Sequence, residues 1–508
     1  MYRPQRIKSA LGDMRRSGKI VMVPALMHDF AKLVSRKECA VIDNHPQNIH
    51  RNERFEENLR SVVTSARKLR TLLLIGKCDH FFLRSFQRVF EKEKYLHMLQ
   101  ISSPYASFDD DFLPNLVNST HLRYLKVKIK GNGEALHIPQ SKFYHLEVLD
   151  AGDSAICNDM NGFVNMRRLV VKNGAHSSIT GYPEEKHNST YQKSGCFGIR
   201  QLQSMNRLVH LSVFQLGNVN TAEADGSKVL RDKQHLEKLQ LSWKDTLSHD
   251  EYDYLQFRDS NVPSSRNFAD MASDVLEGLE PHHNLKYLQI SGYSGVTSPS
   301  WLASSVTNLR DLHLEDSGEW QILPCLESLP FLIKLKLRNM KKVIEVSIPS
   351  LKELVLLNLP KLKLCSCNSV MDLSSSLRVL KISNCHEPKS FPLFESCEKF
   401  NIEQKSWLSR LDKLTIHHCS QLKISNHLPP SSTVSELSAT MLDDKRFAYH
   451  NLRMLTNLTI DAVQDPTDKN MAAANDSALP SLRLLHISFC GIAGKLLSVL
   501  LRHVKALE

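Results

Sequence analysis

Two short clusters in this chain carry side chains that could bind a metal ion. One contains Cys365 and Cys367, and the other contains His417, His418 and Cys419. Thiolate and imidazole groups are common Zn²⁺ ligands, but a structural zinc site needs two such pairs at a fixed spacing. Neither cluster has a second pair at that spacing, and both lie beside apolar repeats. We therefore expect no metal site.

Phosphate-binding and hydrolytic motifs are also missing. Gly-Lys pairs begin at Gly18, Gly76 and Gly494, but Ile, Cys and Leu follow them, where a phosphate loop needs Ser or Thr. Without that loop the chain lacks a cradle of backbone amides and a hydroxyl for Mg²⁺. No Gly-x-Ser-x-Gly or His-Glu-x-x-His motif occurs. The sequence predicts a chain that is not an enzyme and has no catalytic residue, cofactor or metal.

The dominant pattern is a six-residue phrase, Leu-x-x-Leu-x-(Leu/Ile/Val). Its fourth and sixth residues point to one face of a short strand, and its first packs in the same layer. Successive copies are about 26 residues apart, within the roughly 20–29 of leucine-rich repeats. One coil cannot bury this face alone, so neighbouring coils must stack. Clear copies begin at Leu69, Leu96, Leu122, Leu208, Leu236, Leu285, Leu309, Leu332, Leu351, Leu377, Leu411, Leu455 and Leu482, and weaker ones at Leu146, Met166, Cys397 and Val434.

The expected fold is therefore an α/β leucine-rich-repeat solenoid over residues 61–508, with a curved parallel sheet. Overlong gaps predict exposed loops at 173–194 and 244–266, the second followed by a helix from Phe268 to Leu279. Proline favours an irregular convex side, because it donates no amide to a sheet. It recurs near the ends of the gaps at Pro114, Pro139, Pro299, Pro324, Pro330, Pro349 and Pro480.

Residues 1–60 do not fit the repeat. Ile20 to Val23 could form a short strand, and Leu26 to Val34 has the apolar spacing of an amphipathic helix. A polar stretch from Asn44 to Asn58 leads to the first repeat. We expect a separate small fragment here.

The residues between the leucines are the expected binding surface. Phrase positions three, five and seven point away from the core, and we call the surface they form the ladder face. It should bind a protein partner, with an acidic surface docking on its basic clusters, although charges can also serve solubility alone. The two basic clusters are Lys126 and Lys128 with Arg168 and Lys172, and Lys334, Lys336 and Arg338 with Lys381. The predicted residues of the ladder face are Tyr124, Lys126, Lys128, Arg168, Lys172, His210, Phe214, Lys238, Tyr287, His313, Lys334, Lys336, Arg338, Lys381, Lys413, His417 and His486.

Composition narrows the class of partner and compartment. The net charge of +11 favours acidic partners, but Lys and Arg are spread along the chain rather than gathered in an arm that binds nucleic acid. The N-terminus has no apolar core of signal-peptide length, and no stretch could span a membrane. The 11 cysteines form no disulfide-cap pattern, and Cys385, Cys419 and Cys490 fall at a packing position after their phrases. We expect a cytoplasmic chain with reduced thiols.

Two long segments resemble the plant intracellular immune receptors of the nucleotide-binding, leucine-rich-repeat class, in particular the coiled-coil type. One runs from Leu208 to Trp243 and includes Leu216, Asn218 and Lys233. The other runs from Val275 to Pro330 and contains VLEGLEPHHNLK, GYSG and PSWL. This resemblance implies a disease-resistance protein, and the chain would be its C-terminal portion.

The resemblance also extends to the N-terminal fragment, which is similar to the tail of the family's winged-helix subdomain. In that family a Met-His-Asp triplet contacts the bound nucleotide. Two registers are open: Met27, His28 and Asp29 are the triplet, or Val23-Pro24-Ala25 occupies its place. In either register, ADP or ATP would bind only if an upstream nucleotide-binding module is present.

The resemblance implies a sensor that binds a pathogen effector or a guarded host protein in plant defence. The same region would pack against the nucleotide-binding module, in cis or in trans, and hold it closed. The alternative is a free-standing repeat adaptor, such as the substrate-recognition subunit of a ubiquitin ligase. An extracellular repeat receptor is a third reading, opposed by the missing signal peptide and cysteine caps.

Overall fold

The computed structural model describes residues 39–44, 70–76, 96–103, 121–129, 135–136, 138, 143–156, 160–173, 197–219, 228–244, 266–388, 391–395, 409–419, 421–422, 432–440, 454–461 and 481–488. The chain divides into two compact units. The first comprises Met1–Glu134 with Ser141–His145, and the second comprises Ala135–Gln140 with Leu146–Glu508.

The described part of the first unit is a parallel sheet. Its strands are β1 (Cys39–Asn44), β2 (Thr71–Gly76), β3 (Met98–Ser103) and β4 (Tyr124–Ile129). Each pairs in parallel with the next. Strand β1 lies inside the segment 1–60, so parallel pairing begins before residue 61. The strand and helix expected at 20–34, both possible triplets included, lie outside the described residues.

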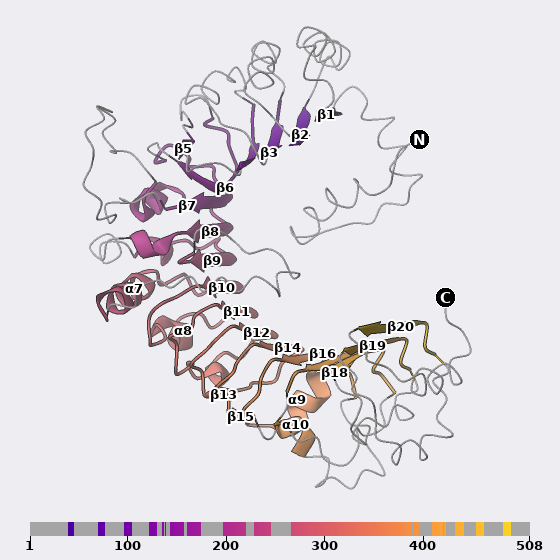
Figure 1. Ribbon diagram of the computed structural model, residues 1–508. Coiled ribbons are helices and arrows are strands. Elements are labelled where there is room, and N and C mark those ends of the chain that lie inside the picture. The colour runs from indigo at the N-terminus through magenta and orange to yellow at the C-terminus, as the bar shows by residue number, and fades with distance from the viewer. Residues whose placement is uncertain are drawn as a thin grey trace, which may run out of the picture. The chain divides into compact units, whose positions relative to one another are not determined.

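The second unit repeats one strand per coil. Its principal strands pair in parallel in chain order (Figure 1), which confirms the leucine-rich-repeat solenoid. The weak phrases at Leu146, Met166 and Val434 all lead into strands, whereas Cys397 lies outside the described residues. The strands are β5 (Ala135–Leu136), β6 (Val148–Ile156), β7 (Arg168–Lys172), β8 (His210–Phe214), β9 (Lys238–Ser242), β10 (Tyr287–Ser291), β11 (Asp311–Glu315), β12 (Lys334–Arg338), β14 (Glu353–Leu357), β16 (Val379–Ser383), β17 (Lys413–His417), β18 (Glu436–Thr440), β19 (Asn457–Asp461) and β20 (Leu484–Ser488).

The fourth residue of each phrase forms a buried row that crosses the strands. Leu239, Leu288, Leu312 and Leu335 are aligned between neighbouring strands, and each is 0% exposed. The row continues in register to Leu458 on β19, which is 1% exposed. Each leucine therefore closes the core for its neighbours, as expected when no coil can bury its own apolar face.

The connections on the other side of the strands are irregular, as the prolines predict. They contain short helices and 3₁₀ turns. The short helices are α8 (Trp301–Ser304), α9 (Val370–Ser376) and α10 (Pro392–Glu395), and the 3₁₀ turns are η3 (Ile199–Ser204), η4 (Leu216–Asn218), η5 (Lys228–Leu230) and η6 (Leu326–Ser328). Helix α7 (Arg266–Gly278) is the predicted helix, displaced by two residues at its start. In Figure 1, α7 and α8 both lie on the same side of the row of strands β9 to β12.

A second, short sheet lies among these connections. Strand β13 (Glu345–Ser347) pairs in parallel with β15 (Leu364–Ser366), and Ile322 forms a bridge to Glu345. Exposed apolar side chains follow this segment through successive coils: Ile322 is 76% exposed, Ile344 47% and Leu364 57%. The sequence pattern gives no sign of this sheet.

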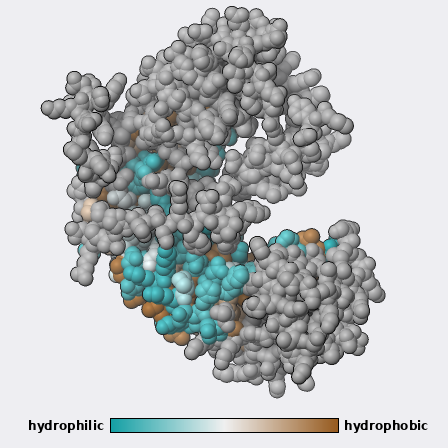
Figure 2. All heavy atoms as spheres, in the orientation of Figure 1, coloured by the Kyte–Doolittle hydropathy of each residue, from teal (hydrophilic) through white to brown (hydrophobic). Residues whose placement is uncertain are grey.

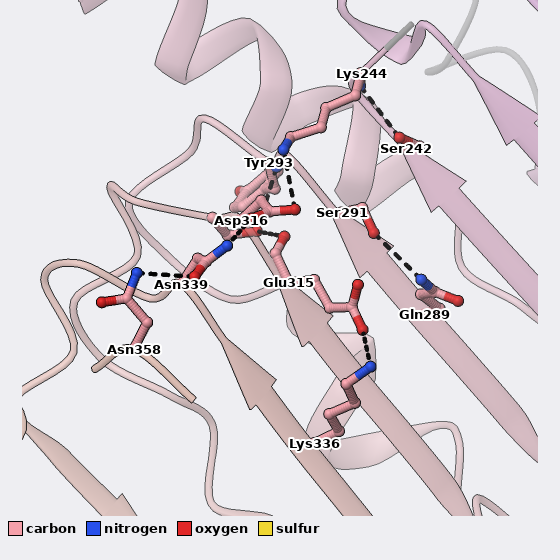
Figure 3. A network of polar contacts seen from close by, with 11 residues as sticks. Ser242, Lys244, Gln289, Ser291, Tyr293, Glu315, Asp316, Lys336, Asn339 and Asn358 are labelled. Atoms are coloured by element: carbon pink, nitrogen blue, oxygen red, sulfur yellow. Dashed lines mark hydrogen bonds and ion pairs between the residues drawn. The ribbon is translucent and has the colours of Figure 1, made fainter. Parts of the chain in front are cut away.

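The eighth phrase position turns the chain out of each strand. Asp316, Asn339 and Asn358 all have φ near +55° there, a conformation that Asn, Asp and Gly adopt at the lowest cost. Asn339 donates its side-chain amide to Asp316, and Asn358 donates to Asn339 at 2.9 Å (Figure 3). The corners of neighbouring coils are therefore hydrogen-bonded to one another.

At the Gly292 corner, a lysine side chain from the preceding coil takes the place of a corner side chain. Its φ is +68°, and an added Cβ would lie 2.6 Å from Cγ of Lys244. The lysine side chain thus passes over Gly292, and its Nζ pairs with Asp316 at 2.9 Å (Figure 3). Because Gly292 has no side chain, Lys244 can reach from the end of β9 past β10 to the corner after β11.

The segments that resemble the immune-receptor family pack against one another. Trp301 Nε1 donates to the Leu276 carbonyl of α7 at 2.9 Å, and the Ser300 amide donates to a Glu277 carboxylate at 2.8 Å. Tyr293, 1% exposed, lies edge-on to both Trp243 and Trp320, with ring centroids 5.1 and 5.2 Å apart. The VLEGLEP, GYSG and PSWL pieces therefore form one packed unit.

Lys233 is a buried cation that links two connections of this region. It is 1% exposed, and its Nζ donates to the Gln203 carbonyl at 2.9 Å and to Asn206 Oδ1 at 2.8 Å. Burial lowers the pKa of its amine. The two acceptors offset the cost of burial by replacing water around the ammonium.

We predict that Gly295→Ala destabilises the second unit by about 1–3 kcal/mol, the usual cost of overpacking a core. The new Cβ would overlap the Tyr293 hydroxyl and lie 2.7 Å from Ser273 Oγ. Tyr293 cannot move aside, because Trp243 and Trp320 hold its ring and its hydroxyl donates to the Thr297 carbonyl at 2.9 Å. Urea unfolding followed by tryptophan fluorescence measures the change.

The matched control for this substitution is Gly198→Ala. Nothing lies within 4 Å of a Cβ at Gly198, where φ is −124°. The control should leave the unfolding midpoint unchanged or raise it slightly. Equal midpoints for both variants would contradict the packing described around Tyr293.

Candidate functional site: the ladder face

The ladder face of the second unit consists of aligned rows of side chains. Strand pairing is in register, so residues at the same phrase position lie side by side. Position three reads Lys238, Tyr287, Asp311, Lys334 and Glu353 from β9 to β14. Neighbouring residues in such a row are about 4.8 Å apart, close enough for direct side-chain contact.

Charges alternate along the third-position row. Lys334 lies between Asp311 and Glu353, and its Nζ is 2.9 Å from a Glu353 carboxylate oxygen. The hydrogen bond to Glu353 raises the pKa of Lys334. Further along, Lys413 pairs with Glu436 at 2.7 Å. These lysines are therefore largely neutralised by carboxylates of neighbouring coils.

The predicted basic cluster of Lys334, Lys336, Arg338 and Lys381 therefore divides in two. Like Lys334, Lys336 is paired: its Nζ is 2.8 Å from Glu315, whose side chain is 8% exposed (Figure 3). Arg338 and Lys381 have no carboxylate within ion-pair distance among the described residues. Figure 2 shows a largely hydrophilic surface over β11 to β14.

The two unpaired cations flank an apolar strip. Lys336, Val355 and Lys381 are neighbours in the fifth-position row, and Arg338, Leu357 and Ser383 in the seventh. Val355 and Leu357 are each 9% exposed. Arg338 and Lys381 thus lie two strands apart, about 10 Å, on either side of the apolar side chains of β14.

A second cationic row lies toward the start of this unit. Arg168, His210 and Lys238 are aligned on β7, β8 and β9. Burial, then the charges of Arg168 and Lys238, lowers the pKa of His210. Lys238 Nζ lies 4.4 Å from the centroid of the Tyr287 ring, a cation–π contact. Lys172 ends β7 on the same face.

Between the cationic groups lies a chain of neutral hydrogen bonds. Ser212 donates to Gln240 at 2.6 Å, and Gln240 donates to Gln289 at 2.7 Å. The Tyr287 hydroxyl donates to Gln289 at 2.9 Å and is 3.1 Å from His313 Nδ1. Burial, then the charge of Lys336, lowers the pKa of His313 to about 4. This part of the face therefore stays uncharged at neutral pH.

The remaining predicted residues are not all gathered on this surface. Tyr124, Lys126 and Lys128 lie on β4 of the first unit, whereas Arg168 and Lys172 lie on β7 of the second. Phe214 is 3% exposed, although its phrase position is on the ladder face. His417 is 2.7 Å from the Ser438 hydroxyl, and His486 is an exposed residue of β20.

The site residues that the sequence-based selection missed are carboxylates. Asp311, Glu315, Glu353 and Glu436 occupy the same phrase positions as the named lysines. The position rule could have identified them, but the linear sequence does not show which lysine each one pairs with. That depends on the lateral register of the coils.

The suspected metal ligands are not brought together. Among the described residues, no group of at least three His, Cys, Asp or Glu side chains could hold a metal ion. Cys365 lies on β15 and His417 on β17. In the same parts of the chain, no helix has both the length and the apolar surface to span a bilayer.

Residues 199–340 match the model of a family described as R13L1/DRL21 leucine-rich repeats. The chain is 26% identical over 291 residues to a putative disease resistance protein, RGA1, of Solanum bulbocastanum; the match covers 57% of this chain and 24% of that protein. It is 27% identical over 150 residues to the putative disease resistance protein RGA4 of the same plant, covering 29% and 13%. The chain thus spans about a quarter or less of these relatives' lengths.

Two solved structures have a weak similarity to this chain. A Leptospira interrogans leucine-rich-repeat protein is 14% identical with a TM-score of 0.43, over 83% of this chain and 91% of that one. The TLR13–ssRNA13 complex is 14% identical with a TM-score of 0.41, over 84% and 69%.

We predict that unfolding stability falls as the pH is lowered from about 6.5 toward 4, in part because of His313. Its folded pKa is near 4 and its ordinary value is 6.5, so the unfolded chain binds the proton more tightly in this window. His313→Gln should flatten this dependence, by at most about 1.4 kcal/mol per pH unit. Denaturant unfolding at pH 7.5, 6 and 5 measures the slope.

His235→Gln is the matched control, because His235 is exposed. His210, whose pKa is also lowered, leaves a residual slope in both variants. An unchanged slope in His313→Gln, or a slope lost equally in the control, would contradict the buried, neutral state of His313.

Proposed function

Because this chain carries a leucine-rich-repeat region of the kind found in plant disease resistance proteins, we propose that its ladder face is a sensor surface for another protein in plant defence. The partner is a pathogen effector or a guarded host protein. Binding takes place on exposed side chains of the strands, in the cytoplasm, and involves no catalysis.

One observation carries this proposal. Arg338 and Lys381 are the cations of β12 and β16 that have no carboxylate partner among the described residues, whereas Lys334 and Lys336 are paired. They flank Val355 and Leu357 of β14. This arrangement suits a partner segment that has acidic side chains on either side of a small apolar contact, because unpaired cations lose no existing ion pair on binding.

The same surface also supports a second role as a contact for a nucleotide-binding module. A module and an effector that use overlapping parts of the ladder face would compete, so binding of one would displace the other. ADP or ATP would then belong to the module. The free-standing adaptor remains the alternative function, and it would use the same face without that competition.

We predict that the double variant Arg338→Glu/Lys381→Glu binds partners of this surface at least about tenfold more weakly, which corresponds to about 1.4 kcal/mol. The wild-type chain is first used as the bait in a two-hybrid screen that recovers interacting plant and pathogen proteins. A separately expressed nucleotide-binding module is included among the prey proteins. Their affinities for the variants are then measured by calorimetry.

Lys361→Glu/Lys363→Glu is the control, since it makes the same change in net charge. Both lysines are exposed and lie between β14 and β15, outside the ladder positions. Its affinities should stay within about twofold of wild type, a change of about 0.4 kcal/mol. If every recovered partner binds the two double variants equally well, the ladder face is not the binding surface.

A further inference from the structure

Cys385 and Cys419 occupy the same position in consecutive coils. Ser383 and His417, the last residues of β16 and β17, are paired in register, and each cysteine follows two residues later. The intervening residues, Asn384 and His418, both have positive φ, at 54° and 49°. The two corners therefore have matching backbone geometry, which directs both cysteine side chains in the same sense.

The surroundings of the two sulfur atoms match as well. Cys385 Sγ lies 4.0 Å from the Leu356 carbonyl oxygen and 3.5 Å from that of Ser383. Cys419 Sγ lies 3.8 Å from the Ile382 carbonyl oxygen and 3.2 Å from that of His417. In each case these are the sixth position of the preceding coil and the seventh of the same coil.

This geometry places the two cysteines side by side at neighbouring corners. Equivalent backbone positions on neighbouring strands are about 4.8 Å apart, within the roughly 4.4–6.8 Å of Cα separations that a disulfide bridges. The two thiols influence each other's acidity, because each shifts the pKa of the other. Both are free thiols, as the formation of a new disulfide requires.

The two thiols differ in accessibility and acidity. Cys385 is 0% exposed, whereas Cys419 is partly exposed. The interaction with the Cys419 thiol, followed by burial, raises the pKa of Cys385. The same interaction lowers the pKa of Cys419. Cys419 is therefore the thiol that an oxidant reaches first and the one with more thiolate character.

We propose that Cys385 and Cys419 are an oxidation site, at which a hydroperoxide converts the two thiols into a disulfide that joins neighbouring coils. The Cys419 thiolate attacks a peroxide oxygen, the O–O bond breaks, and a sulfenic acid forms with release of hydroxide or alkoxide. The Cys385 thiol then attacks the sulfenic sulfur. An S–S bond forms, the S–O bond breaks, and water leaves as Cys385 gives up its proton. The thiols lose two electrons and the peroxide gains them.

The other described cysteines are poorer candidates. Cys365 lies on β15 rather than at one of these corners, and burial raises the pKa of its thiol to about 12. Burial, followed by the charge of Glu327, raises the pKa of Cys367. Cys325 is exposed and is the natural control, because it reports ordinary surface oxidation.

A disulfide at this place would change how the repeat array unfolds. In a solenoid each coil is stabilised by its neighbours, and coils can separate locally. The bond would join the coil that contains Lys381 to the coil that contains Lys413, at the corners that follow β16 and β17. Oxidation would then restrict movement of that part of the surface without altering its exposed side chains.

The test uses the full chain with dilute hydrogen peroxide, followed by proteolysis and mass spectrometry without reductant. We expect a peptide pair linked through Cys385 and Cys419 as the main disulfide, which dithiothreitol reverses. Neither Cys419→Ser nor Cys385→Ala should form it. In Cys385→Ala, the Cys419 sulfenic acid should persist and be trapped by dimedone. Cys325→Ser should form the disulfide as the wild type does.

Three outcomes would overturn the proposal. One is that both thiols remain reduced while Cys325 is oxidised. Another is that Cys419 is oxidised to sulfinic acid in the wild type without forming the bond. The third is that Cys419 pairs with a different cysteine or with a second chain. The wild-type peptide map decides among these outcomes even if a substituted chain folds poorly.

Discussion

The stacking of identical strand positions in parallel register is the constraint on which this structure depends. The second leucine of each phrase lies against the second leucine of its neighbours, from Leu239 through Leu335 to Leu458. A strand alternates its side chains between two faces, so fixing this row fixes every other position. A shift of one residue in a single coil would expose its leucines and bury its charges.

This register also organises the polar parts of the molecule. It places Lys334 between Asp311 and Glu353, and it aligns Asp316, Asn339 and Asn358 at successive corners. Several charges of the ladder face, those of Lys334, Lys336 and Lys413, are consequently paired with carboxylates of neighbouring coils. Surface ion pairs of this kind contribute little stability individually. They also distinguish Lys334 and Lys336 from Arg338 and Lys381, which have no carboxylate partner among the described residues.

The sequence predicts the repeats well because the leucine phrase states which residues are buried in each coil. It also predicts α7, since Ala272, Val275, Leu276 and Leu279 have helical spacing and are all buried. It does not predict the short β13–β15 sheet, because Val346 is buried in β13 but Leu364 of β15 is exposed, so no repeated apolar phrase marks these strands. The phrase pattern also does not predict that β1, within residues 1–60, pairs in parallel with β2.

The candidate surface could be predicted by position but not by charge. The rule for positions three, five and seven identifies Lys336. Its ion pair with Glu315, however, depends on a contact between neighbouring coils, and the two residues are 21 positions apart in the sequence. The rule also places Phe214 on the open face, where it is 3% exposed. The burial of Phe214 depends on the residues packed around the end of β8, and the spacing of the leucines does not predict which residues these are.

The most direct test of the stacked register is a cysteine scan along β12 with a thiol-reactive reagent in the folded protein. Lys334→Cys, Lys336→Cys and Arg338→Cys should react readily, because their native side chains are exposed or half-buried. Leu335→Cys and Leu337→Cys should be protected until the chain unfolds, because both native leucines are 0% exposed. Uniform reactivity along the strand, or protection at positions 334 and 336, would contradict the stacked parallel ladder.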